Sequence, residues 1–191
     1  MNFIQDGKGR GYLTEVTSEN KLAVQGIVDT TYDNASQTGE SFNVNTEFVS
    51  ITVGTETPLF YFKNLEAEDV VVVGWFIGIG VAGGTPTENA LLRVYANPTS
   101  VSGGVSITTV NRTIGSGRSF DFTTLKQSGG TPLTATLPSV PVLYQTQTAS
   151  SRVFGNVYLT VPRNNSLIVT CQLNGAQTAN IYTGFTGYVA S

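Results

Sequence analysis

The 191-residue sequence contains no histidine and a single cysteine. Without histidine, the Ser-His-Asp and Cys-His arrangements of hydrolases cannot form, and the usual zinc sites lose a common ligand. With only Cys171, no disulfide can form within the chain. This cysteine alternates with Leu167, Val169 and Leu173 in SLIVTCQL, so we expect a buried thiol in a core strand rather than a reactive one.

Charged residues are also scarce, at 12% of the chain against about 25% in typical globular domains. The net charge is −3 and the isoelectric point is near 4.9. Proteins that bind nucleic acid cluster lysine and arginine on one basic face. We therefore expect no nucleic-acid partner.

Long hydrophobic runs are missing too. The most apolar segment, VVVVGWFIGIGVA at 70–82, is shorter than the about 20 residues that a membrane-spanning helix needs. Residues 1–15 contain Asp6, Lys8 and Arg10 and no apolar core segment, which argues against a secretory signal peptide. We expect no membrane association.

With histidine absent, the remaining route to catalysis is a pair of carboxylates, as in glycoside hydrolysis. The chain has 13 Asp and Glu residues, but most lie beside turns and no two are singled out by position. The acidic stretch Glu66-Ala67-Glu68-Asp69 lacks the glycine-spaced ligands of a calcium loop and is more typical of a solvated turn. The sequence therefore predicts a non-enzymatic protein with no cofactor and no metal.

What the sequence does contain is a succession of short strands. From Phe42 onward about ten apolar segments of period two alternate with turns rich in glycine and asparagine. This pattern predicts an all-β fold, an antiparallel β-sandwich of the jelly-roll kind, over residues 42–191. A change of phase between Val44 and Val49 predicts a bulge or tight turn near residues 45–47.

The segment 70–80 is the most informative strand. Its larger side chains share one face, and we expect them to lie in the core: Val71, Val73, Trp75, Ile77 and Ile79. The opposite face carries Gly74, Gly78 and Gly80 around Phe76. Bare backbone on that side predicts an outer face that something covers closely.

Residues 1–41 read as an N-terminal arm. The stretch Gly7-Lys8-Gly9-Arg10-Gly11-Tyr12 has too little chain before it for the strand and helix of a phosphate loop, so we interpret its glycines as a flexible joint. Alternation in residues 12–16 and 21–25 predicts a two-stranded hairpin across the turn at 17–20. Residues 27–41 then form a turn-rich connector.

Two stretches, GKGRGYLTEVTSENKLAVQG and ASQTGESFNVNTEFVSIT, resemble a family of virion structural proteins of tailed bacteriophages. The shared features are a Gly-x-Gly-Tyr start, an Asn-x-Leu-x-Val second strand and a Gly-x-Ser-Phe-x-Val segment that opens the sandwich, all within residues 7–53. The resemblance implies a non-enzymatic, homotrimeric jelly roll carried on a phage particle, assembled in the host cytoplasm. The resemblance leaves open whether the protein belongs to the head shell or to the tail of the particle.

The first hypothesis is a capsid decoration, or cement, protein that docks on the major capsid protein or on neighbouring virion subunits through its arm. Arg112 and Arg118, on either side of a glycine-bearing loop, form a second basic spot that could meet a neighbouring subunit. The candidate docking residues in the arm comprise two cations and five apolar side chains: Lys8, Arg10, Tyr12, Leu13, Val16, Leu22 and Val24.

Two alternatives remain. One is a tail fibre or baseplate subunit, or a receptor-binding knob, that recognises host-surface glycan. The other is a lone carbohydrate-binding module. Both need exposed aromatic side chains, for which the sequence offers Tyr144, Tyr158, Tyr182 and Tyr188, whereas Trp75 shares a face with aliphatic residues and is expected in the core.

Overall fold

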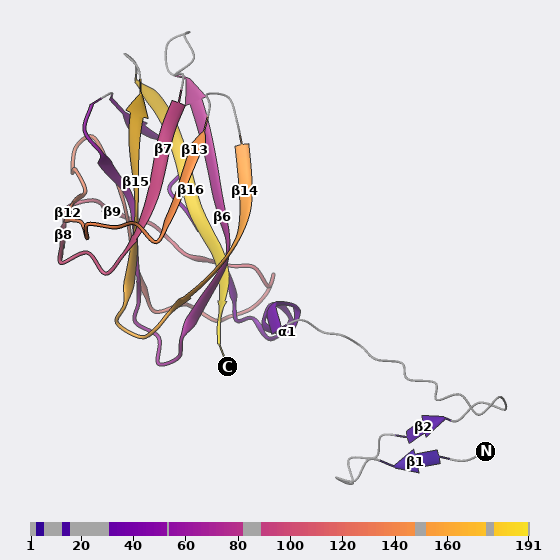
Figure 1. Ribbon diagram of the computed structural model, residues 1–191. Helices are drawn as coiled ribbons and strands as arrows, with labels where there is room; N and C mark the ends of the chain where they lie inside the picture. The colour runs from indigo at the N-terminus through magenta and orange to yellow at the C-terminus, as the bar shows by residue number, and fades with distance from the viewer. Residues whose placement is uncertain are drawn as a thin grey trace. The chain divides into compact units, whose positions relative to one another are not determined.

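The computed structural model describes residues 3–5, 13–15, 31–52, 54–81, 89–147, 152–174 and 178–190 (Figure 1). The chain divides into two compact units, Met1–Thr30 and Thr31–Ser191. The sequence places this boundary between residues 41 and 42. The structure places it earlier because residues 31–38 form a helix that packs on the sandwich.

The first unit contains a two-stranded antiparallel sheet. Strand β2 (Leu13–Glu15) lies in the predicted strand 12–16, but it pairs with β1 (Phe3–Gln5), where the sequence predicts no strand. The predicted partner, residues 21–25, lies outside the described residues.

Helix α1 (Thr31–Thr38) replaces most of the predicted connector. Its Asn, Ser and Thr residues favour turns over helices, which is why the sequence pattern predicts no helix here. Packing and a terminal cap hold it instead: Ala35 is buried, and Thr113 donates a hydrogen bond to the carbonyl of Ser36. Gly39 has a φ of 82°, and the Glu40 amide bonds to the Ala35 carbonyl at 2.8 Å, which is the closing bond of a Schellman motif.

The second unit is built on two six-stranded sheets in which all described pairings are antiparallel. The first sheet runs in the order β10 (Val110–Asn111), β3 (Ser41–Asn45), β16 (Ala179–Val189), β6 (Val70–Val81) and β14 (Arg152–Val161), with β4 (Val49–Ile51) also paired to β16. The second runs in the order β13 (Leu143–Gln147), β7 (Asn89–Ala96), β15 (Ser166–Asn174), β5 (Thr57–Asn64), β11 (Phe122–Lys126) and β9 (Val105–Ser106). The predicted all-β antiparallel sandwich is confirmed.

The chain passes from one sheet to the other at almost every step. From β3 and β4 it crosses to β5, back to β6 and across to β7; after β13 it crosses to β14, β15 and β16 in turn. Two sheets interleaved in this way, with β3, β16, β6 and β14 side by side in one and β5, β15, β7 and β13 in the other, have the connectivity of paired Greek keys. The order supports the finer prediction of a jelly roll, which stays a prediction.

The core between the sheets is centred on phenylalanine rings. Phe42 and Phe185 come from the first sheet, and Phe60 and Phe62 from the second, and all four are fully buried. Phe42 stacks on Phe62 with ring centroids 5.8 Å apart, and Phe60 meets Phe185 at 5.4 Å. Burying each such ring contributes roughly 2 to 3 kcal/mol, so these contacts join the sheets strongly.

The predicted core face of β6 is correct over only part of its length. Trp75, Ile77 and Ile79 are buried as expected. At the start of the strand, however, Val70 and Val72 are buried, rather than Val71 and Val73. The cause is a bulge, because the register against β16 shifts where Gly74 faces Thr186 and Val72 faces Gly187. One additional residue on β6 moves the side chains before it to the other face.

The predicted change of phase after Val44 is confirmed. Asn45 faces Gly184 and Val49 faces Ile181, so four residue steps on one side span three on β16. Glu47, with a φ of 55°, lies in the left-handed region within this bulge.

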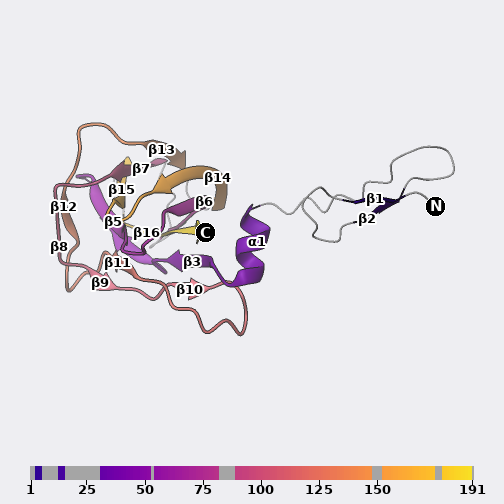
Figure 2. The ribbon, with the colours of Figure 1, turned by 90° about the horizontal axis from the view of Figure 1, so that it is seen from below.

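The two outer faces of the sandwich differ. Strands β8 (Ser100–Ser102) and β12 (Thr134–Thr136) form a small sheet beside the second sheet, where Leu133 closes a second apolar cluster over Tyr61, Tyr95 and Ile168. On the other side of the sandwich, α1 lies against β3 and β16 of the first sheet (Figure 2).

Gly184→Ala should destabilise the sandwich by about 3 kcal/mol, because an added Cβ would lie 2.1 Å from the Val44 carbonyl oxygen and 2.8 Å from the Asn45 Cα. Neither backbone atom can move without disturbing the pairing of β3 with β16. Urea denaturation measures the loss. In the control Gly155→Ala the nearest atom is the Trp75 carbonyl oxygen at 3.8 Å, and a change below about 0.5 kcal/mol is expected. Equal losses in both variants would contradict the argument.

Candidate functional site

The outer face of the first sheet carries a line of four aromatic side chains, which we call the aromatic row: Phe154, Phe76, Tyr182 and Phe48. They come from β14, β6, β16 and the segment between β3 and β4. Phe154 is the cross-strand partner of Phe76. The ring centroids of Phe76 and Tyr182 are 6.5 Å apart, and those of Tyr182 and Phe48 are 5.3 Å apart. The row therefore crosses most of the width of the sheet.

Glycines lie beneath these rings. A Cβ on Gly78 would lie 2.0 Å from the Tyr182 ring, and one on Gly74 would lie 2.5 Å from the Phe154 ring. The rings thus occupy the space that side chains would otherwise fill, which confirms the expectation that this glycine-bearing face is closely covered. Phe154 and Phe48 nevertheless remain 61% and 62% exposed.

Two shallow hollows flank Phe76. One is lined by Asn43, Arg112, Phe154 and Thr186 and the other by Asn45, Glu47, Phe48 and Tyr182. Hydrogen-bonding groups therefore border the apolar rings on both sides, as in ligand sites where a few polar groups fix orientation.

Each hollow contains one charged side chain with a partner. Arg112 donates from Nη1 to Thr186 Oγ1 at 3.0 Å. Lys126 Nζ lies 2.8 Å from Glu47 Oε2, and this hydrogen bond and positive charge lower the pKa of the Glu47 carboxyl. Two cations and one anion therefore border the row, and because Lys126 and Glu47 form an ion pair, the net charge there is small.

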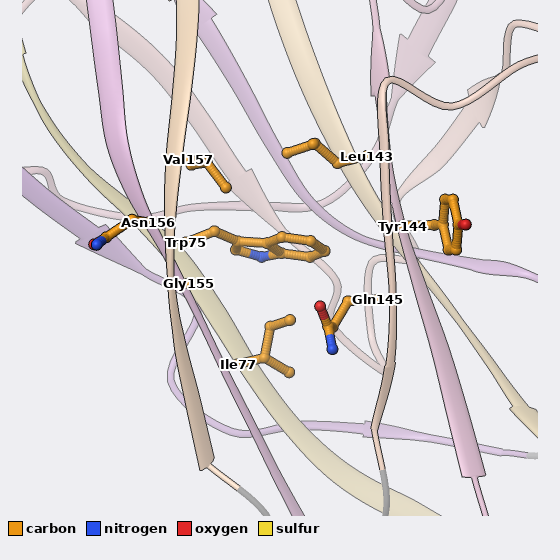
Figure 3. Close-up of a pocket in the computed structure, with 8 residues that line it drawn as sticks. All are labelled: Trp75, Ile77, Leu143, Tyr144, Gln145, Gly155, Asn156 and Val157. Atoms are coloured by element: carbon orange, nitrogen blue, oxygen red, sulfur yellow. The ribbon is translucent and has the colours of Figure 1, made fainter.

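A second candidate surface lies between β13 and β14, the end strands of the two sheets among the described residues. Trp75 forms the floor of a hollow there, with Leu143, Ile77 and Val157 around its ring, whereas Tyr144 points away (Figure 3). The Trp75 Nε1 donates to Thr183 Oγ1 at 2.8 Å, so the indole is a satisfied core residue, as its position in the sequence predicts.

Three exposed apolar side chains lie in β13 and in the residues just before it: Val140, Val142 and Tyr144, which we call the rim surface. Within the described part of the chain, β13 and β14 are the end strands of their sheets. Unpaired strand edges with apolar side chains are the places where natural sheets add a partner.

Of the predicted docking residues, the structure describes only Leu13, Arg112 and Arg118. Leu13 lies in β2, and Lys8, Arg10, Tyr12, Val16, Leu22 and Val24 lie outside the described residues. Arg112 borders the aromatic row. Arg118 instead is bound within the chain.

Arg118 joins three segments. Its Nε lies 2.8 Å from Glu40 Oε2 and its Nη2 lies 3.4 Å from Glu66 Oε2, while its guanidinium is 5.2 Å from the centre of the Phe120 ring. These contacts connect the end of α1, the turn after β5 and the loop before β11. These contacts within the chain account for Arg118, and no contact with a neighbouring subunit is needed to explain it.

The predicted tyrosines fall into different places. Tyr144 and Tyr158 are strongly exposed, Tyr182 belongs to the aromatic row, and Tyr188 is half-buried. Sequence reasoning missed Phe48, Phe76 and Phe154. The signal in the sequence that could have indicated them was the set of glycines around Phe76, because glycine in a strand leaves space that side chains from neighbouring strands can fill.

In the described ranges, no three His, Cys, Asp or Glu residues gather in a way that would hold a metal ion. Glu56 forms an ion pair with Arg93 at 2.9 Å and accepts a hydrogen bond from Thr170.

No helix among the described residues has the length and apolar character to cross a bilayer.

No protein-family model matches this sequence, and no curated protein sequence is significantly similar to it.

Arg118→Met should lower the free energy of unfolding by about 1 kcal/mol, because it leaves the half-buried carboxylates of Glu40 and Glu66 without their cation. The loss should shrink in 1 M salt, which screens the wild-type ion pairs. Arg163→Met, in the exposed turn before β15, is the matched control and should have no measurable effect in urea denaturation. A loss no larger than that of the control would mean that the three contacts contribute nothing to stability.

Cys171 should not react with a thiol reagent such as DTNB at pH 8 while the protein is folded. Burial, with a smaller contribution from the nearby Glu56 charge, raises the pKa of the thiol to about 12. The reactive thiolate is then about 10⁻⁴ of the population at pH 8 and grows only as the pH approaches 12. Full labelling should appear on adding denaturant, and rapid labelling in native buffer would contradict the buried position.

Proposed function

We propose that this chain is a non-enzymatic structural subunit of a tailed-phage particle. In this proposal it forms a homotrimer, residues 1–30 attach it to the particle, and the sandwich is displayed. The version that we favour is a head decoration protein bound to the major capsid protein or to neighbouring virion subunits. The observation that carries the proposal is the division of the chain into a small N-terminal unit and a complete sandwich.

A unit of this kind is poorly suited to stand alone. The only strands described in it, β1 and β2, have three residues each. Two-stranded sheets are marginal in water, and units this small usually need an additional source of stability. Binding to another protein surface would supply the missing apolar burial through Tyr12, Leu13, Val16, Leu22 and Val24. Lys8 and Arg10 would then meet acidic groups on that surface.

The rim surface supports association between copies. Val140, Val142 and Tyr144 are exposed there, and β13 and β14 are the end strands of their sheets in the described part of the chain. Apolar side chains and free strand edges together are what subunit interfaces bury. We assign the contact between copies in the trimer to this surface.

A tail fibre, baseplate subunit or receptor-binding knob is the second candidate. The aromatic row favours it, because a displayed surface with exposed rings suits recognition more than passive cementing. The number of copies per particle separates the two, since a shell protein is present in hundreds and a tail protein in a few to a few dozen.

A protein consisting of Thr31–Ser191 should fold but lose binding to particles that lack the subunit. We expect at least a hundredfold weaker binding in a co-sedimentation assay, because the attaching residues are gone. The double variant Lys8→Glu, Arg10→Glu should weaken binding about tenfold and make it less sensitive to salt. Arg163→Glu, a charge reversal in an exposed turn of the sandwich, is the matched control and should bind normally.

Unchanged binding by the Thr31–Ser191 protein would overturn the attachment by residues 1–30. Quantitative mass spectrometry of purified particles tests the wider proposal. Hundreds of copies would agree with the head, a few to a few dozen would favour the tail, and none would end the virion proposal.

A further inference from the structure

We propose that the aromatic row binds a neutral oligosaccharide laid across the outer face of the first sheet. This inference goes beyond the structural role proposed above and does not depend on where the particle carries the chain. It rests on the rings of Phe154, Phe76, Tyr182 and Phe48, on the polar groups beside them and on the balance of charge around them.

The rings match the apolar side of a sugar chain. A pyranose unit presents a patch of C–H groups on one face of its ring, and this patch packs on an aromatic ring with loss of water from both. Phe154 and Phe48, at the two ends of the row, are exposed by 61% and 62% and are available for such contact.

The length of the row indicates a chain rather than a compact ligand. Its members occupy successive strand positions on β14, β6, β16 and the segment after β3. Neighbouring strands are about 4.8 Å apart, so the row extends about 14 Å across the sheet. Several linked sugar units would contact successive rings.

The hollows beside Phe76 offer partners for hydroxyl groups. Asn45 and Glu47 border one hollow and Asn43 and Arg112 border the other. These amide, carboxylate and guanidinium groups can donate hydrogen bonds to sugar hydroxyl groups or accept hydrogen bonds from them.

Charge selects the class of sugar. The cation Arg112 and the anion Glu47 lie in opposite hollows, and Lys126 accompanies the second. These charged groups are already engaged within the chain, since Glu47 pairs with Lys126 and Arg112 donates to Thr186, and a charged ligand would have to compete with those contacts. An uncharged polyhydroxyl chain faces no such competition.

The test uses the full chain and a defined panel of neutral hexasaccharides: cellohexaose, maltohexaose, mannohexaose and N-acetylchitohexaose. Saturation-transfer NMR should show contact between at least one of them and aromatic protons, and calorimetry should give its Kd. Phe48→Ala and Phe154→Ala should each weaken that binding about tenfold, since each removes one stacking ring. Both side chains are mostly exposed, so these variants should stay folded, which circular dichroism checks.

Tyr144→Ala is the matched control. It removes an aromatic side chain of similar exposure, 75%, from the rim surface rather than from the row. It should leave the Kd unchanged. Equal weakening by the control would overturn the assignment to the row.

Absence of binding to every member of the panel at millimolar concentration would overturn the proposal. Sedimentation velocity in the absence of sugar provides the other decisive outcome. If Phe48→Ala or Phe154→Ala breaks an oligomer into single chains, the row is a contact between copies and the proposal fails. None of these outcomes bears on the attachment of residues 1–30, which the particle-binding assay tests separately.

Discussion

The bulge on β6 is the constraint on which the rest of the sandwich depends. It lies between Val72 and Gly74, opposite the register shift in β16. Before it, Val70 and Val72 face the core, and after it Trp75, Ile77 and Ile79 do. An uninterrupted strand would have to expose one of these two sets, because strict alternation places them on opposite faces. The bulge keeps both sets inside and thereby places Phe76 and its neighbouring glycines outside.

The glycines on the outer face of β6 make room for the aromatic rings of the neighbouring strands. Glycine in a strand weakens it, through the entropy that the backbone loses on folding and through the missing side chain. Here the rings of Phe154 and Tyr182 from adjacent strands cover Gly74 and Gly78 and restore packing. The same contact limits how these rings can turn. A surface whose aromatic groups are already held in place loses little further freedom when it binds a ligand, which favours affinity.

Sequence patterns predicted where single strands lie better than they predicted which elements pack beside one another. Alternation located the strand at 70–80 and the buried positions of Trp75 and Cys171, because side-chain period is a local property. It assigned Val71 and Val73 to the wrong face because a bulge changes the phase without changing the composition. Helix α1 was missed because its residues favour turns, although Gly39 was a visible stop signal.

The aromatic row could not be read from the sequence for a different reason. Its four residues are spread from Phe48 to Tyr182, and only the order of strands in the sheet makes them neighbours. The sequence gives the face on which each ring stands relative to its own strand, but not which strand lies beside it. The arm is similar, since β2 fell within a predicted strand, yet its partner β1 lay where no strand was expected.

The positions of the two candidate surfaces bear on how they would act together. Phe154 begins the aromatic row on β14, and β14 is also one border of the hollow beside the rim surface. If copies associate through the rim surface, each row then starts near a boundary between copies. Rows brought together in this way would bind a repeating polysaccharide through several sites at once. Linked sites raise overall binding by factors of about 10² to 10⁴ without any new contact, so weak stacking on each row would suffice for firm attachment.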